Sequence, residues 1–235
     1  MTTVSNTTLA DKNQAYWNGA AKSVFKDKWV HDLQKQISDF LTSNVDWIGM
    51  QLPSNDTERQ TELMDYTYID EFACNDNKYR ATAATLGLPE SRMMAVQGNL
   101  LAPMVQPTNP PLDDEELDCF DLVAICMALH HVDDIQLATQ RLASRRRPGG
   151  VFLIIDWATR GSLDIHEHAS PDAVHPEHPA AHTISHDSFT QEQIVSLYGQ
   201  AGCGDARFVL ADRLSDVPGA RSGKMQLVWA RATKL

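Results

Sequence analysis

Two apolar runs, each the length of one strand, restrict the fold of this chain more than any other feature. Residues 120–127 read FDLVAICM and residues 151–157 read VFLIIDW, and polar residues do not alternate through either run. This pattern is typical of strands that are buried on both faces of a parallel sheet. Residues 132–144 lie between the runs and have the length of a crossover helix, followed by the breaker PGG at 148–150. The pattern predicts an α/β fold with a mostly parallel sheet.

The rest of the chain predicts further helices and strands around these runs. Apolar residues recur at three- and four-residue steps over 16–41, which predicts two helices with a break near 26–28. We expect further strands at 61–66, 93–97, 206–210 and 225–230, and a helix at 190–201. The strands that contain Val96, Val123 and Ile154 should be parallel neighbours in one sheet. The chain is expected to form one compact α/β unit over 46–235, preceded by a helical segment over 1–45.

Charge and cysteine content argue against several kinds of partner. The chain has 20 Lys and Arg residues against 31 Asp and Glu residues, a formal net charge of −11. An acidic chain has no general attraction for nucleic acid or for anionic membranes, so we expect neither as a partner. The N-terminal residues show no secretory signal, and no apolar run has the length of a spanning helix. A reducing, cytoplasmic location is expected because the four cysteines are scattered: Cys74, Cys119, Cys126 and Cys203.

Four short motifs follow one another in the second half of the chain. They are FDLV from Phe120, ALHH at 128–131, PGG at 148–150 and VFLIID from Val151. In this order and at this spacing they resemble the class I S-adenosylmethionine-dependent methyltransferases. The resemblance implies a Rossmann-like fold with an N-terminal helical lid over 1–45. It also implies transfer of a methyl group from S-adenosylmethionine to a nucleophile on a small-molecule acceptor.

The resemblance further implies a set of residues around the methyl donor. Acidic residues near the ends of the family's first two strands would hold the ribose, and residues after the third and fourth strands would line the adenine and the methyl-bearing end. Asn99 stands where the family often has an acidic residue, and its amide oxygen can accept a hydrogen bond from the adenine amino group. The implied donor-site residues are Asp65, Asp70, Gly98, Asn99, Leu100, Met127 and Ala128.

The chain departs from the family at the glycine-rich loop that follows the first strand. No glycine occurs between Asp65 and Gly87, and the interval 67–92 is long enough for about one helix with its loops. The sequence therefore predicts that one strand–helix unit is lacking. Three interpretations remain open: an active methyltransferase, a related protein that has lost donor binding (a pseudo-enzyme, a partner subunit or a non-methylating cyclase or isomerase), or a shortened splice form of an active homologue.

Histidines are the candidate catalytic residues. His130 and His131 follow a buried strand at the edge of the sheet where α/β proteins bind ligands, although a histidine there can also make only local hydrogen bonds. If the acceptor is a hydroxyl compound, a general base is needed; His131 is our first candidate and His186 the second. Six of the nine histidines lie within 166–186, but no cysteine accompanies them. We expect no metal there and interpret the segment as a loop that covers the acceptor site.

Overall fold

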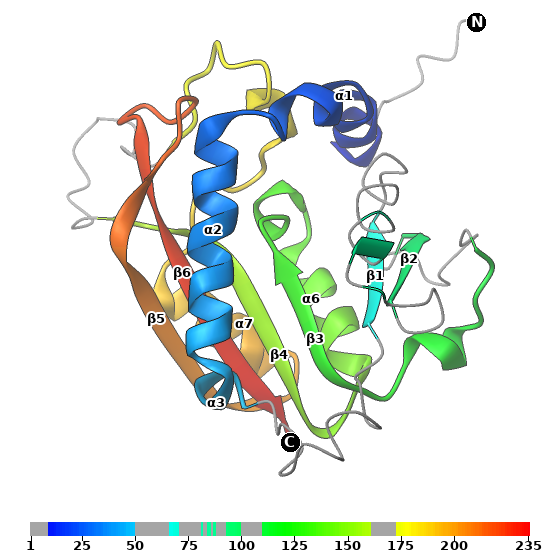
Figure 1. Ribbon diagram of the computed structural model, residues 1–235. Helices are drawn as coiled ribbons and strands as arrows, with labels where there is room; N and C mark the ends of the chain where they lie inside the picture. The colour runs from blue at the N-terminus through cyan, green and yellow to red at the C-terminus, as the bar shows by residue number, and fades with distance from the viewer. Residues whose placement is uncertain are drawn as a thin grey trace, which may run out of the picture.

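The computed structural model describes residues 9–49, 66–70, 93–99, 110–160 and 173–235, together with residues 81, 84, 85 and 87 (Figure 1). None of the helices in this described part is long and apolar enough to cross a membrane.

A four-stranded sheet forms the centre of the molecule (Figure 1). Its strands lie in the order β3 (Phe120–Cys126), β4 (Arg146–Ala158), β6 (Lys224–Lys234) and β5 (Cys203–Asp216). β3 and β4 are parallel, and β6 is antiparallel to both β4 and β5. The two apolar runs of the sequence are therefore parallel neighbours, as predicted. The expected burial on both faces is confirmed for β4 but is wrong for β3, whose residues are half-buried or exposed.

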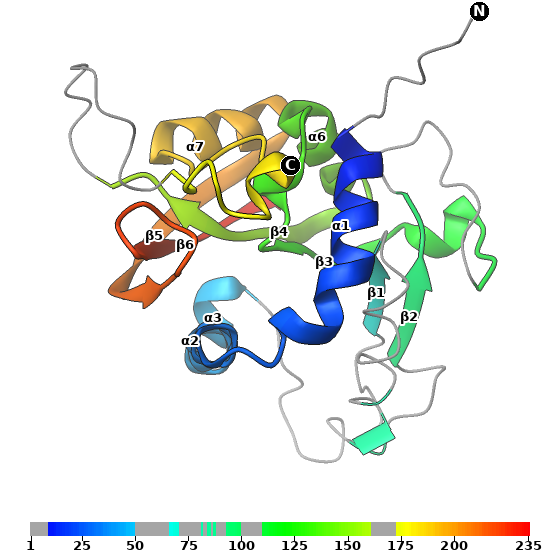
Figure 2. The ribbon, with the colours of Figure 1, turned by 90° about the horizontal axis from the view of Figure 1, so that it is seen from above.

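Helices cover both faces of this sheet because β4 sends apolar side chains to both sides (Figure 2). Phe152 and Ile154 pack against α6 (Ile135–Ser144) and α7 (Gln191–Gln200). Leu153, Ile155 and Trp157 belong to the cluster on the opposite face, which includes Leu33 of α2 (Lys28–Ser43). The predicted crossover helix is α6, and it begins where the Asp134 carboxylate accepts a hydrogen bond from the Leu137 backbone N–H.

The N-terminal segment forms two helices with a break between them, as the sequence predicted. α1 (Leu9–Val24) ends before the break, α2 begins at Lys28, and the short helix α3 (Val45–Ile48) follows α2. α3 ends at Gly49, whose backbone φ of +87° is in the left-handed region that favours glycine. α1 lies over the ends of β3 and β4, whereas α2 runs along the face formed by β5 and β6 (Figures 1 and 2).

The expectation of one continuous sheet is wrong for the first two strands. β1 (Tyr66–Asp70) and β2 (Met93–Gln97) pair in parallel, but they form a separate two-stranded sheet. The strand that contains Val96 is therefore not hydrogen-bonded to the strand that contains Val123. In both views β1 lies beyond β3, on the side away from β4 (Figures 1 and 2).

The length of the chain between β1 and β2 explains why these strands are separate from the main sheet. Doubly wound sheets have the order 3-2-1-4-5-6, so the family's first strand stands between its second and its fourth. The interval between β1 and β2 holds one crossover, and β1 takes the place of the family's second strand, next to the third. The expected strand at 61–66 is described only at Tyr66, where β1 begins. Among the described residues, the sheet is thus interrupted where this order places the family's first strand.

Two further expectations need correction. β4 begins at Arg146, so the PGG motif lies inside the strand as an irregularity, with a register shift between Phe120 and Leu122 of β3. β5 and β6 are longer than the apolar runs at 206–210 and 225–230 indicated. α7 is confirmed, and the Thr190 side chain forms a capping box with Gln193.

Candidate active site

Two neighbouring parallel strands, β3 and β4, bring polar residues to their shared carboxyl ends. The chain leaves β3 at Met127, whose backbone N–H donates to the Ile155 carbonyl oxygen at 2.8 Å. It then forms the 3₁₀ turn η2 (Leu129–His131). Asp156 lies near the end of β4 and is fully buried. Ligand sites of α/β proteins form at this edge of the sheet.

His130 and Asp156 form a buried pair at this edge. His130 Nδ1 lies 2.7 Å from Asp156 Oδ1, and the His130 backbone N–H donates to Asp156 Oδ2 at 3.2 Å. The Trp157 N–H donates to the same carboxylate at 2.8 Å. Because a carboxylate only accepts, Nδ1 of His130 carries the hydrogen and the basic position is Nε2. The carboxylate thereby fixes the tautomer and the orientation of the ring.

His131 is held by a different partner and has different chemistry. Its Nδ1 lies 2.8 Å from the carbonyl oxygen of Thr183, which can only accept, so Nδ1 carries the hydrogen and Nε2 has the lone pair. Burial lowers the pKa of His131 to about 3, and neighbouring His130 adds to the shift; the Thr183 hydrogen bond and Asp156 oppose it. At neutral pH His131 is therefore an uncharged imidazole that accepts a hydrogen bond at Nε2.

Aromatic side chains of α1 pack against this histidine. The Trp17 ring meets His131 edge-on with ring centroids 5.5 Å apart, and Tyr16 meets His182 in the same way at 5.4 Å. The Asn13 side-chain amide also donates to the His131 carbonyl oxygen at 3.4 Å. α1 therefore contacts the turns that carry both histidines, as Figure 2 shows from above.

His186, the second catalytic candidate, lies beside the first. The backbone N–H groups of Ser185 and His186 both donate to the carbonyl oxygen of His130, at 3.0 and 3.1 Å. The His186 ring is tilted against Phe189, and its Nε2 is buried without a hydrogen-bond partner among the described residues. The structure thus brings His131 and His186 together through His130.

The implied donor-site residues are placed in part. Asp65 and Leu100 lie outside the described residues. Three others lie at the ends of the strands of the two-stranded sheet. Asp70 is the last residue of β1. Gly98, which is buried, and Asn99, which is half-buried, follow β2. Met127, with φ of +52°, and Ala128, which is exposed, lie directly before the histidine turn.

Sequence reasoning pointed to His130 but missed its pairing with Asp156. The signal was present, because each residue comes at or just after the end of an apolar run. Adjacent parallel strands end at the same edge, so polar residues that follow two such runs are expected to meet. The role of Thr183 had no signal, since it is contributed by a turn of irregular backbone, η3 (Ala181–Thr183). The described part of this histidine-rich segment holds no group of three or more metal-ligating side chains.

Comparison with known proteins identifies the fold. No family model matches the chain. A stretch of 90 residues is 30% identical to an uncharacterized methyltransferase of Schizosaccharomyces pombe; it covers 38% of this chain and spans only 30% of that relative. A solved structure of a putative sarcosine dimethylglycine methyltransferase from Galdieria sulphuraria is similar with a TM-score of 0.57, 13% identity, and coverage of 87% of this chain and 88% of that one. An S-adenosylmethionine-dependent methyltransferase from Methanosarcina mazei has a TM-score of 0.49 at 13% identity, with 77% and 87% covered. The chain therefore has the fold of the class I S-adenosylmethionine-dependent methyltransferases.

Proposed function

We propose that this protein transfers a methyl group from S-adenosylmethionine to a nucleophilic atom of a small-molecule acceptor. The observation that carries the proposal is the pair of adjacent histidines at the shared ends of β3 and β4, in a methyltransferase fold. One histidine is bound to a buried carboxylate and the other is uncharged. Acceptor activation needs such groups, one to orient a hydroxyl or amine and one to take its proton.

The two histidines suit different parts of this task. When bound, S-adenosylmethionine supplies an electrophilic methyl group, so the protein mainly has to align the acceptor. His131 presents an Nε2 lone pair and orients an acceptor O–H or N–H, but its lowered pKa makes it a poor holder of a proton. The Asp156 carboxylate fixes the His130 ring with Nε2 as its basic nitrogen, so His130 is our candidate general base. His186 Nε2, which has no hydrogen-bond partner among the described residues, is a second polar group near this turn.

The residues present fit the adenosine part of the donor better than its amino-acid part. Asp70 would bind the ribose hydroxyls, Asn99 would bind the adenine amino group, and Met127 with Ala128 would border the methyl-bearing end. Asp65 and Leu100 complete the proposed set. The amino-acid end is normally held by backbone N–H groups of a glycine-rich loop. No glycine occurs between Gly49 and Gly87 to provide one.

The lack of a glycine between Gly49 and Gly87 favours a second candidate function. A protein with this fold that has lost donor binding would keep the acceptor-side histidines and act as a pseudo-enzyme, a partner subunit or a non-methylating cyclase or isomerase. The two candidate functions differ in whether S-adenosylhomocysteine is formed. A methyltransferase converts S-adenosylmethionine to S-adenosylhomocysteine only when an acceptor is present, whereas the second candidate does not consume S-adenosylmethionine.

The experiment is an acceptor screen read by mass spectrometry. The protein is incubated with S-adenosylmethionine and a panel of small phenols, alcohols and amines, and S-adenosylhomocysteine is measured. The His131→Asn variant retains an N–H for the Thr183 carbonyl but removes Nε2, and we expect it to lower turnover about 10²-fold. The control His31→Asn changes an exposed histidine of α2 and should leave turnover unchanged. If no acceptor yields S-adenosylhomocysteine and the folded protein does not bind S-adenosylmethionine, methyl transfer is refuted and the second function remains.

A further inference from the structure

The two histidines at the ends of β3 and β4 each offer one ring nitrogen to a ligand. Nδ1 of His130 donates to Asp156, and Nδ1 of His131 donates to the Thr183 carbonyl oxygen, so Nε2 of each ring remains. Neither Nε2 makes a hydrogen bond within the described residues, and neither atom is fully enclosed. The ring centroids are 4.1 Å apart. Because an imidazole ring is small, one small molecule can contact both Nε2 atoms.

Two neighbouring hydrogen-bond acceptors fit a ligand with two neighbouring donors. A hydroxyl group carries one hydrogen, so a single hydroxyl can donate to His130 or to His131 but not to both. The other Nε2 would then lose its contact with water without gaining a partner, which costs free energy. Two hydroxyl groups on adjacent carbon atoms satisfy both nitrogens at once.

The surroundings of these histidines favour an acceptor without charge. Within the described residues, Asp156 is the one charged side chain in their hydrogen bonds and ring contacts, and it is fully buried and already accepts three N–H groups. No lysine or arginine of the described chain is among these contacts. A carboxylate or phosphate would meet no cation here, and an ammonium would meet no available anion, so burying either charge is costly.

Aromatic side chains of α1 lie next to His131. Trp17 meets the His131 ring edge-on with centroids 5.5 Å apart, and Tyr16 meets Trp17 edge-on at 5.1 Å. Both residues are half-buried. Aromatic rings prefer edge-to-face and offset contacts with other rings. A planar aromatic acceptor can therefore pack against α1 while its hydroxyl groups face the histidines.

The acidity of the hydroxyl also favours an aromatic acceptor. A phenolic hydroxyl has a pKa of about 10, as in tyrosine, whereas an aliphatic hydroxyl is nearly as weak an acid as water, whose pKa is about 15.7. General-base catalysis by an imidazole is most effective for a proton that is not too tightly held. A phenol therefore suits His130 better than an alcohol does.

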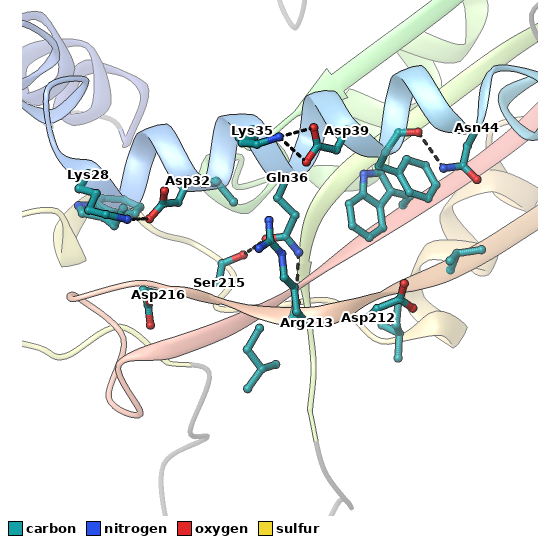
Figure 3. A pocket seen from close by; sticks show the side chains of 17 residues that line it. Lys28, Asp32, Lys35, Gln36, Asp39, Asn44, Asp212, Arg213, Ser215 and Asp216 are labelled. Carbon is teal, nitrogen blue, oxygen red and sulfur yellow. Dashed lines mark hydrogen bonds and ion pairs between the residues drawn. The ribbon is translucent and has the colours of Figure 1, made fainter.

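The groove between α2 and β5 does not offer these features (Figure 3). Its volume is about 800 Å³, and none of its described lining residues is a histidine. Its lining includes exposed ion pairs along α2, Lys28 with Asp32 and Lys35 with Asp39. The groove thus lacks an imidazole to take the proton of a hydroxyl group, and the two histidines are the better place for the acceptor.

We propose, as an inference that rests on the proposed function, that the acceptor is an uncharged aromatic compound with hydroxyl groups on two adjacent ring carbons. One hydroxyl donates to His131 Nε2 and holds the ring in place. The adjacent hydroxyl gives its proton to His130 Nε2 while its oxygen bonds to the methyl carbon; the bond from that carbon to sulfur breaks, and its electron pair stays on sulfur. The products are a monomethyl ether and S-adenosylhomocysteine, and His130 passes the proton on to water.

The test compares acceptors that share a ring and differ in their reactive groups. The full-length protein is incubated with S-adenosylmethionine and with a one-ring and a two-ring series, each comprising an adjacent diol, its single-hydroxyl and methoxy-hydroxyl analogues, an amine and a carboxylate. Methylated products are measured by mass spectrometry. We expect the diol to react about tenfold faster or more than the single-hydroxyl compounds, which lack one hydrogen bond, and the amine and carboxylate to stay unmethylated.

Two variants separate the roles of the histidines. His131→Asn keeps an N–H for the Thr183 carbonyl oxygen but removes Nε2, so it should abolish the preference for the diol as well as lower turnover. His130→Asn keeps an N–H for Asp156 but removes the base, so it should slow diol and single-hydroxyl compounds alike, about 10²-fold, and keep the preference. The control His31→Asn, at an exposed position of α2, should change neither quantity. Circular dichroism confirms that the variants are folded.

The outcomes distinguish this inference from the proposed function. Equal or faster methylation of a single hydroxyl, an amine or a carboxylate overturns the diol assignment but leaves methyl transfer intact, as does a diol preference that His131→Asn retains. The assignment is also overturned if the folded protein binds S-adenosylmethionine but methylates no member of either series. A folded wild type that does not bind S-adenosylmethionine and methylates nothing refutes the proposed function itself.

Discussion

Acid should destabilise this protein through His131 in particular. In the folded state the pKa of His131 is about 3, because its ring is buried and lies beside His130, whereas its ordinary value is 6.5. Between these two values the unfolded chain binds a proton that the folded protein does not. The folded state therefore has its full stability above pH 6.5 and loses stability as the pH falls from 6.5 towards 3.

The magnitude follows from the two pKa values. With 6.5 for the unfolded state and about 3 for the folded state, the loss is about 2 kcal/mol at pH 5 and about 3 kcal/mol at pH 4. Other groups also titrate in this range, so the prediction concerns a difference between proteins. His131→Asn retains a donor for the Thr183 carbonyl but does not titrate, and it should lose about 3 kcal/mol less than wild type between pH 7 and pH 4.

Urea unfolding followed by fluorescence at several pH values measures these free energies. The control is His31→Asn, which removes an exposed histidine of α2 and should leave the pH dependence of wild type unchanged. If His131→Asn and wild type lose the same stability on acidification, His131 is not held as an uncharged, buried imidazole. The proposed lone pair at Nε2 would then have no basis.

Three further substitutions, two of them with a matched control, test other parts of the structure by the same unfolding assay. Asp156→Ala should lower the free energy of unfolding by about 3–5 kcal/mol, because it leaves the buried His130 N–H groups without their acceptor. The control Asp121→Ala breaks an exposed ion pair with Arg147 and should lower it by less than about 1 kcal/mol. Equal costs would refute the buried pair. Gly150→Ala should destabilise the protein by about 1–3 kcal/mol, since a Cβ there would lie 2.8 Å from the Phe120 carbonyl oxygen, but Gly199→Ala in α7 meets open space and should stabilise by about 0.5–1 kcal/mol. Tyr198→Phe removes a hydroxyl that donates to the Ala230 carbonyl at 2.7 Å and should cost about 1 kcal/mol; no loss would mean that this bond contributes nothing.

The fold could be predicted where apolar patterns were complete. β3 and β4 are apolar runs without alternation, and the helices α2, α6 and α7 carry apolar residues at helical spacing with recognisable ends. These signals are local, so the sequence was sufficient. The two N-terminal helices and their break near Asp27 were predictable for the same reason.

Pairing between distant segments could not be predicted in the same way. β5 is an edge strand with charged residues and two register shifts, so no apolar run marks its full length of Cys203–Asp216. The separation of β1 and β2 from the main sheet depends on which strand neighbours β3. The length of the interval 67–92 does not specify that neighbour. The candidate site likewise contains residues that the sequence predicted and one that it did not. His130 and His131 were candidates from their position, whereas Thr183 orients His131 from a turn 52 residues away in the chain.

The proposed function requires that the protein bind its methyl donor, which titration calorimetry with S-adenosylmethionine and S-adenosylhomocysteine measures. We expect the folded wild type to bind both compounds. Asn99→Ala should weaken binding about tenfold through loss of a hydrogen bond to adenine, and Asn44→Ala, at the end of α2, should leave it unchanged. Binding that Asn99→Ala does not weaken would place the donor elsewhere. A well-folded wild type that binds neither compound would contradict methyl transfer altogether.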